Sequence, residues 1–211
     1  SDVNNISILK VKTFHSGCLS SETNGASYLI NQPHNYPVVS IILDSLALFD
    51  ATSGIYHYGN DLEPNYDADG FASERKVLME YFDENGNLVF SEDLGLRIAG
   101  NGSRHSAVKN LKLYLRDQYG NGKINQQLFT DENLAVFETL LLRSGGHRPD
   151  CMPRDELGSS ITNVLPFEKA HFRYVVVYIN GEYWGIHSIK QKLDEDHLHN
   201  KYDIHKNEVV L

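Results

Sequence analysis

One short segment of this sequence combines three glycines with two lysines, residue types that together can bind phosphate. Residues 95–116 read GLRIAGNGSRHSAVKNLKLYLR. The glycines, Gly100 and Gly102 among them, let the backbone adopt positive φ and approach a ligand closely, because they carry no Cβ. Lys109 and Lys112 follow the glycines and supply positive charge. A glycine-rich turn followed by a lysine suggests a site for a nucleotide phosphate.

The segment that carries Lys112 is predicted to be a β-strand. Leu111, Leu113 and Leu115 alternate with polar or aromatic residues, which is the period of a strand with one buried face. The same pattern fits a simpler structure, a β-hairpin whose turn requires glycines and whose Lys112 lies on a solvated face. The residues alone leave both interpretations open.

The composition limits the partners that we expect. With 211 residues and 41% hydrophobic residues, the chain can form one large domain or one domain with a small appendage. A net charge of −9 argues against a nucleic-acid-binding surface, but it allows a phosphate held by a local cationic patch. The sequence has no apolar run near twenty residues, so we expect no membrane span.

Cysteine and histidine spacing does not predict a metal site. Cys18 and Cys151 are far apart and form neither a disulfide framework nor a metal-binding motif. His197 and His199 lie two positions apart on a predicted helix, so they point to different faces.

The pattern of elements predicts an α+β fold that is mainly an antiparallel sheet with a few helices. Expected strands include a continuous apolar run at 38–43 that would be buried on both faces, and two hairpins whose turns contain Asn-Gly. Residues 130–143 begin like a helix, although the late LLLR could instead be a strand. The other elements expected are strands at 6–13, 27–31, 76–82, 88–90, 174–179 and 182–190, helices starting near 153 and 194, and a last strand at EVVL, 208–211.

Several of these motifs resemble the spore coat protein H (CotH) family over about residues 37–211. The NGEYWGI hairpin and the G-x-R-I-x-G-x-x-S-R stretch carry most of the resemblance. Before them, VKTFHSGCLSSETNGASYLI is similar to the last strands of the β module found at the C-terminus of chitobiase and β-hexosaminidase. We therefore expect residues 1–36 to be terminal strands of a small β module with a linker, and residues 37–211 to be the N-terminal portion of a CotH-like kinase domain.

The CotH resemblance implies an atypical protein kinase that transfers phosphate from ATP, with Mg²⁺, to serine. The fold would resemble the N-lobe of such a kinase. The acceptor would be a serine-containing secreted, surface or coat protein, which implies an extracellular or cell-surface location, the spore coat in some relatives. The upstream module would add a glycan partner.

The resemblance also assigns roles to individual residues. Lys109 and Lys112 are the two candidates for the lysine that pairs with the α and β phosphates, and we favour Lys112 because it lies inside the strand. Glu156 or Asp155 would orient that lysine from a helix, and adenine would rest near residues 191–194. The residues expected over the phosphates are Gly100, Asn101, Gly102, Ser103 and Arg104.

Two departures from the family pattern affect the expected activity. Lys190 and Gln191 stand where relatives commonly carry an arginine and a glutamate. Phosphoryl transfer also needs catalytic and metal-binding carboxylates from a following lobe, so we expect residues 1–211 alone to lack kinase activity. The alternative function is a non-catalytic cell-surface module that binds glycan or protein through exposed aromatic residues, with Trp184 as a candidate.

Overall fold

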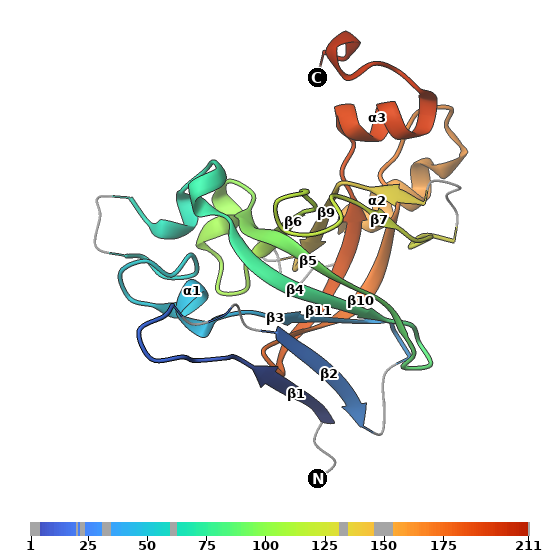
Figure 1. Ribbon diagram of the computed structural model, residues 1–211. Coiled ribbons are helices and arrows are strands. Elements are labelled where there is room, and N and C mark those ends of the chain that lie inside the picture. The colour runs from blue at the N-terminus through green and yellow to red at the C-terminus, as the bar shows by residue number, and fades with distance from the viewer. Residues whose placement is uncertain are drawn as a thin grey trace. The chain divides into compact units, whose positions relative to one another are not determined.

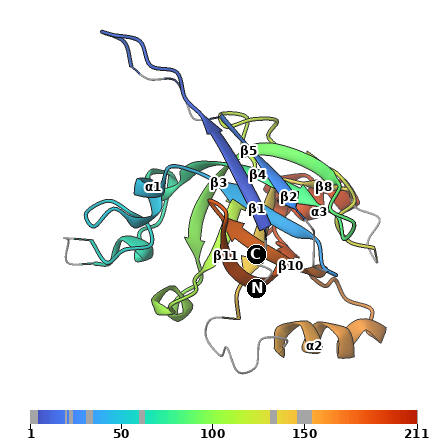
Figure 2. The same ribbon diagram turned by 90° about the horizontal axis from the view of Figure 1, so that it is seen from below.

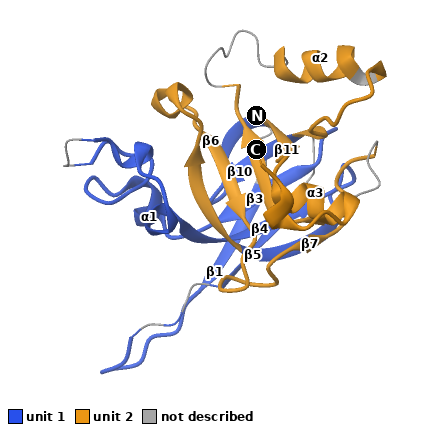
Figure 3. Cartoon of the chain, turned by 90° about the horizontal axis from the view of Figure 1, so that it is seen from above, with its two compact units in different colours: residues 1–93, 175–186 blue, residues 94–174, 187–211 orange. Residues whose placement is uncertain are grey.

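The computed structural model describes residues 5–19, 21, 24–30, 35–59, 63–130, 135–145 and 154–210 (Figure 1). These residues contain three α-helices and a mainly antiparallel set of strands, so the predicted α+β class is confirmed. None of the described helices is long and apolar enough to cross a membrane. The chain divides into two compact units. One contains residues 1–93 and 175–186, and the other contains residues 94–174 and 187–211 (Figure 3).

Seven strands are hydrogen-bonded in the order β10-β11-β9-β6-β5-β4-β3 and close into a barrel. β3 pairs antiparallel with β4, and β6 pairs antiparallel with β5 and β9, whereas β10 runs parallel to β3. The strands are β3 (Val38–Ile42), β4 (Arg75–Phe82), β5 (Leu88–Ala99), β6 (Asn110–Tyr114), β9 (Thr139–Arg143), β10 (Phe172–Ile179) and β11 (Glu182–Gln191).

The first unit contains a strand pair that packs on β3 and its neighbours. β1 (Asn5–Val11) and β2 (Asn24–Ile30) pair antiparallel, as two views show (Figures 1 and 2). Ile6 and Leu29 on this pair pack against a buried cluster that includes Val38 and Phe82. Every residue of β3 is buried, as its apolar run predicts. The strand pair and β3 therefore share one core, and the domain boundary near residue 36 stays a prediction.

The Asn-Gly turn of the second hairpin has the backbone that its sequence predicts. Asn180 and Gly181 have φ values of 52° and 86°, and these positive angles are those of a type I′ turn between β10 and β11. The prediction of this hairpin is confirmed.

α1 (Ser45–Phe49) is a short helix of the same unit, and Asp44 caps its N-terminus by accepting from Leu46 N.

The second unit presents one buried and one partly exposed face of β6 and β9. Leu111 and Leu113 on β6 and Leu140 and Leu142 on β9 are fully buried. The residues between them, Lys112 among them, point the other way and are less buried. The alternation predicted for 111–115 is thus confirmed, and it places Lys112 on the face away from the core.

The alternative left open for the late part of residues 130–143 is confirmed, because LLLR lies in β9, where the alternate burial of Leu140 and Leu142 gives the period of a strand. A helix over 136–137 is wrong, since Val136–Phe137 form β8. The helix-capping acids predicted at 131 and 132 lie outside the described residues. The expected strand at 208–211 is also absent from its described part: Lys206–Glu208 form a 3-10 turn and Val210 is 97% exposed.

The two expected helices near 153 and 194 are confirmed. α2 (Arg154–Ile161) begins directly after the proline, and α3 (Glu195–Tyr202) is capped by Asp194, whose side chain accepts from His197 N. One more short strand of this unit, β7 (Ile124–Asn125), pairs with β8.

Candidate phosphate-binding site

The glycine-rich turn after β5 is compact and needs glycine at its first position. Gly100 has φ of +107°, and a Cβ added there would lie 2.1 Å from the Ser103 hydroxyl oxygen. The chain then enters a 3-10 turn, Gly102–His105, and Asn110 Nδ2 donates to that Ser103 oxygen over 3.1 Å. The predicted stretch 100–104 is therefore one tight turn joined to the start of β6.

Lys109 is bonded to the carbonyls of this turn. Its ammonium donates to the carbonyl oxygens of Arg104 at 2.5 Å and Ser106 at 3.1 Å, and the side chain is buried. Arg104 in turn donates from Nε to the Gly100 carbonyl. Lys109 is one of the two lysines predicted to bind phosphate. Its hydrogen bonds go to backbone carbonyl oxygens, so Lys109 stabilises the turn itself.

Lys112 lies in a different setting, beside an aromatic ring and other cations. Its ammonium is 4.5 Å from the centroid of the Tyr114 ring. The guanidinium carbons of Arg97 and Arg116 are 5.1 and 4.7 Å from the same centroid. Arg97 is also the partner of Lys112 in the β5–β6 register, while Gly95, opposite Tyr114, has no side chain to compete for space.

Lys192 brings a further positive charge from the end of β11. Register places Lys112 beside Leu141 of β9, and Leu141 beside Lys190 of β11, so these three residues form one row. Lys192 follows two positions later, and it lines a small pocket together with Thr139, the register partner of Tyr114. Strands distant in sequence therefore bring Lys192 to the end of the sheet where Lys112 and Tyr114 lie.

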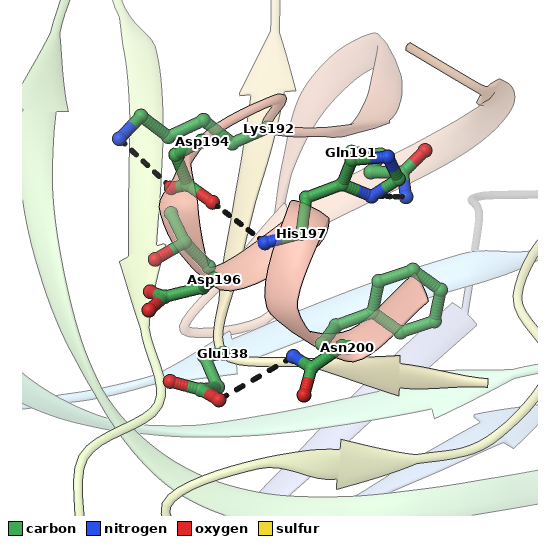
Figure 4. Close-up of a pocket in the computed structure, with 9 residues that line it drawn as sticks. Glu138, Gln191, Lys192, Asp194, Asp196, His197 and Asn200 are labelled. Atoms are coloured by element: carbon green, nitrogen blue, oxygen red, sulfur yellow. Dashed lines mark hydrogen bonds and ion pairs between the residues drawn. The ribbon is translucent and has the colours of Figure 1, made fainter. Parts of the chain in front are cut away.

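The pKa values of the two lysines respond to this crowding in opposite directions. Burial and the nearby charges of Lys192 and Arg97 lower the pKa of Lys112 to about 8. Burial also disfavours the charged form of Lys192, but its hydrogen bond to Asp194 raises the pKa of Lys192. The Lys192 ammonium lies 2.8 Å from that carboxylate (Figure 4). These cations form a group that we name the cation cluster: Arg97, Lys112, Arg116 and Lys192. Asp194 and Glu195 are carboxylates that favour the charged form of Lys192.

Glu156 and Asp155 of α2 have partners other than the predicted lysine. Glu156 is buried, and Ser188 Oγ donates to its Oε1 over 2.6 Å. Asp155 forms an ion pair of 2.6 Å with Arg143, the register partner of Ser188. Both acids therefore attach α2 to β9 and β11, and the structure brings neither one into an ion pair with Lys112 among the described contacts.

The segment expected beside adenine is held by a buried polar network. Gln191 Oε1 accepts from His171 N, which directs its amide nitrogen to His197 Nδ1 at 2.6 Å. The remaining His197 proton then lies on Nε2 and faces Glu168 at 3.2 Å. Figure 4 shows Gln191 and His197 pointing toward each other, with Asp194 close to the start of the helix. This network connects the end of β11 to α3.

Sequence reasoning missed Arg97 and Tyr114 as parts of the site, and it placed Lys192 only within the range 191–194 expected beside adenine. Apolar residues alternate with polar or aromatic ones along 111–116, which places Tyr114 on the same strand face as Lys112. This pattern could have identified Tyr114 from the sequence. No local signal identifies Lys192, because its approach depends on the pairing of β6, β9 and β11.

Metal ligands do not gather around the cation cluster. The described residues contain no group of three or more His, Cys, Asp or Glu side chains that could hold an ion. The donor set present is cationic and therefore fits the phosphates of a nucleotide, whereas it does not fit Mg²⁺.

Comparison with known protein families agrees with the sequence resemblance. Residues 96–211, more than half of the chain and the whole of the cation cluster, match the family described as CotH kinase protein. A comparison with curated proteins finds no match. The chain belongs to the CotH kinase protein family.

Proposed function

We propose that this chain is the nucleotide-binding lobe of a CotH-type kinase that transfers phosphate from ATP to a serine. The acceptor would be a secreted, surface or coat protein, which would place the protein outside the cell or on its surface. Family membership supports the kinase-like activity. The observation that carries nucleotide binding is the cation cluster, in which Lys112 has cations and an aromatic ring as neighbours.

In this proposal, each part of the site has a separate task. Lys112 and Arg97 would bind phosphate oxygens, since charge-assisted hydrogen bonds to phosphate are among the strongest in proteins. Lys109 would keep the turn 100–104 compact over the phosphates through its bonds to the Arg104 and Ser106 carbonyls. ATP, when bound, would supply the phosphoryl group.

Glu156 would act on the site through β11. Its bond to Ser188 attaches α2 to the strand whose end leads to Lys192, so Glu156 is a positioning residue in this proposal. It would maintain the position of the end of β11 without touching the nucleotide.

Isothermal calorimetry with ATP and magnesium tests the proposal. We expect saturable binding by the wild type and at least a tenfold loss of affinity in Lys112→Ala, because a charge-assisted contact to phosphate is removed. Lys76→Ala is the matched control, since Lys76 is also a strand lysine but already forms an ion pair with Asp93. Absence of ATP binding, or equal binding by both variants, would contradict the proposal.

The alternative is a binding module that uses aromatic residues of the first unit. Trp184 packs against Tyr56 and Phe49, with ring centroids 5.5 and 5.8 Å apart, and donates to the Tyr56 hydroxyl. Phe49 and Tyr183 remain 45% and 50% exposed. Saturable binding of a polysaccharide that Phe49→Ala abolishes, with no effect of ATP, would favour this alternative.

A further inference from the structure

We propose that Asn110 is a positioning residue of the nucleotide site, and that it orients the Ser103 hydroxyl to donate to a phosphate oxygen. This inference rests on the proposed nucleotide function and extends it. Ser103 lies in the turn after β5, whereas Asn110 is the first residue of β6. The hydrogen bond between the two side chains therefore joins the glycine-rich turn to the strand that carries Lys112.

Asn110 and Lys112 lie on the same face of β6. Side chains two positions apart on a strand point the same way, about 7 Å apart along it. The residue between them, Leu111, is fully buried on the opposite face. Because Ser103 contacts the Asn110 side chain, the turn lies over the end of the face from which Lys112 projects. A phosphate chain that lies along this face can contact both Lys112 and the turn.

The contacts of Asn110 fix the direction of its amide. The backbone N–H of Ser144, which directly follows β9, can only donate, and its nitrogen lies 2.9 Å from Asn110 Oδ1. The amide nitrogen is therefore on the other side, where Nδ2 donates to Ser103 Oγ over 3.1 Å. Asn110 thus supplies an acceptor to one neighbour and a donor to the other, and neither aspartate nor leucine could do both.

The donor from Asn110 determines where the Ser103 hydroxyl proton points. A serine oxygen that accepts one hydrogen bond still has its own proton to donate. Among the described residues, the partner of the Ser103 hydroxyl is the Asn110 amide, and no acceptor for its proton is present. Ser103 is only partly buried, so a ligand can reach this proton. A phosphate oxygen is a suitable acceptor, since hydrogen bonds to ionised groups are stronger than neutral ones.

Gly100 leaves the space that this hydroxyl occupies. A Cβ added at Gly100 would lie 2.1 Å from Ser103 Oγ and 3.6 Å from Asn110 Nδ2, so any side chain there would displace the hydroxyl. The three residues therefore have separate tasks in the proposed site. Gly100 provides room, Ser103 provides the donor, and Asn110 provides its direction.

Calorimetry of the 211-residue chain with ATP and magnesium tests the inference through two substitutions and their combination. Ser103→Ala removes the donor, and we expect it to weaken ATP binding about tenfold. Asn110→Asp keeps the shape and still accepts from Ser144 N, but its carboxylate would accept the Ser103 proton and turn it away from the ligand. Asn110→Asp should therefore cost about tenfold more affinity in the wild type than in the Ser103→Ala background. Repulsion between the new carboxylate and phosphate is common to both backgrounds and cancels.

Asn125→Asp is the matched control, since it adds the same charge at an exposed strand asparagine of the same unit and should leave ATP affinity nearly unchanged. Urea denaturation measures the stability of each variant. A merely structural role of Asn110 would lower stability without making the loss of ATP affinity depend on Ser103. Ser103→Ala removes only a partly buried hydroxyl, so it decides the inference even if Asn110→Asp does not fold.

The outcomes separate this inference from the proposed function. If Lys112→Ala weakens ATP binding but Ser103→Ala does not, or if the losses from Ser103→Ala and Asn110→Asp multiply, the inference is wrong and the nucleotide function stands. If Ser103→Ala weakens inorganic tripolyphosphate and ATP binds no more tightly than tripolyphosphate, the hydroxyl donor stands and the nucleotide function is wrong. If the folded wild type binds neither ligand, both are wrong.

Discussion

Two charged regions of the second unit differ in how completely their charges are paired. Around Glu168, one carboxylate receives Lys201 Nζ at 2.8 Å, the Tyr202 hydroxyl and His197 Nε2. Around Lys112, the charges of Lys192 and Arg97 outweigh that of Asp194, which is ion-paired with Lys192. The neighbours of Glu168 therefore favour its charged form, whereas the neighbours of Lys112 disfavour its charged form. Charges that favour each other stabilise a fold, whereas a group whose charge is disfavoured is a candidate for binding a ligand of opposite charge.

The pKa directions express the same difference. Burial opposes the ionisation of Glu168, but hydrogen bonds from Lys201 and Tyr202 lower its pKa to about 2, so its charge is favoured. Burial and neighbouring cations lower the pKa of Lys112 to about 8, so its charge is disfavoured. The fold thus stabilises the charged form at Glu168 and destabilises it at Lys112.

The largest effect on stability is expected from Glu168→Gln. The variant leaves the donors of Lys201 and Tyr202 without a charged acceptor, which should lower the free energy of unfolding by about 1–3 kcal/mol. Urea denaturation measures this loss. Glu208→Gln, at an exposed position near the C-terminus, is the control and should change stability little. Equal stability of Glu168→Gln and the wild type would remove the contrast between the two regions.

Acid should weaken the Glu168 region in a defined range of pH. A carboxylate whose pKa is lower in the folded state stabilises the fold above its unfolded pKa, and that contribution is lost as the pH falls through the folded value. For Glu168 the range runs from about 4.5 down to about 2. Urea titrations from pH 6 to pH 2.5 should show that the free energy of unfolding falls in the wild type and falls less in Glu168→Gln. Parallel curves for the two proteins would contradict the assignment.

A smaller effect of opposite sign is expected from Lys112→Met. Methionine keeps the apolar stem and removes a charge that its neighbours disfavour. The free energy of unfolding should therefore stay the same or rise by up to about 1 kcal/mol. The same urea titration measures it, with Lys76→Met as the control that breaks an ion pair. Strong destabilisation by Lys112→Met would mean that the lysine has a structural role.

The sequence predicted the strands and turns whose signals are local. The Asn-Gly turn at 180–181 and the alternation around Lys112 are examples, because turn chemistry and periodicity act over a few residues. For residues 130–143 the sequence left a helix and a late strand both open, because an apolar run of that length fits either element until its partners are known. β6 and β11 are the partners that make it a strand.

The candidate site could be predicted only in part, for a related reason. Lys112 was found from the sequence, since a strand lysine after a glycine turn is a local pattern. Arg97 was not found, and the approach of Lys192 to Lys112 was not predicted, because both follow from the register of strands far apart in the chain. Glu156 or Asp155 was identified as a helix acid by resemblance, but the burial of Glu156 and its partner, Ser188, could be found only from the fold.

The titration of Lys112 tests the central claim most directly. Nuclear magnetic resonance of the lysine side chains, with Lys112→Ala to assign the signal, reports its pKa in the free protein and with ATP. We predict a pKa near 8 in the free protein that rises when ATP binds, because phosphate replaces the missing negative charge. A pKa near the ordinary 10.5 in the free protein, unchanged by ATP, would contradict the account.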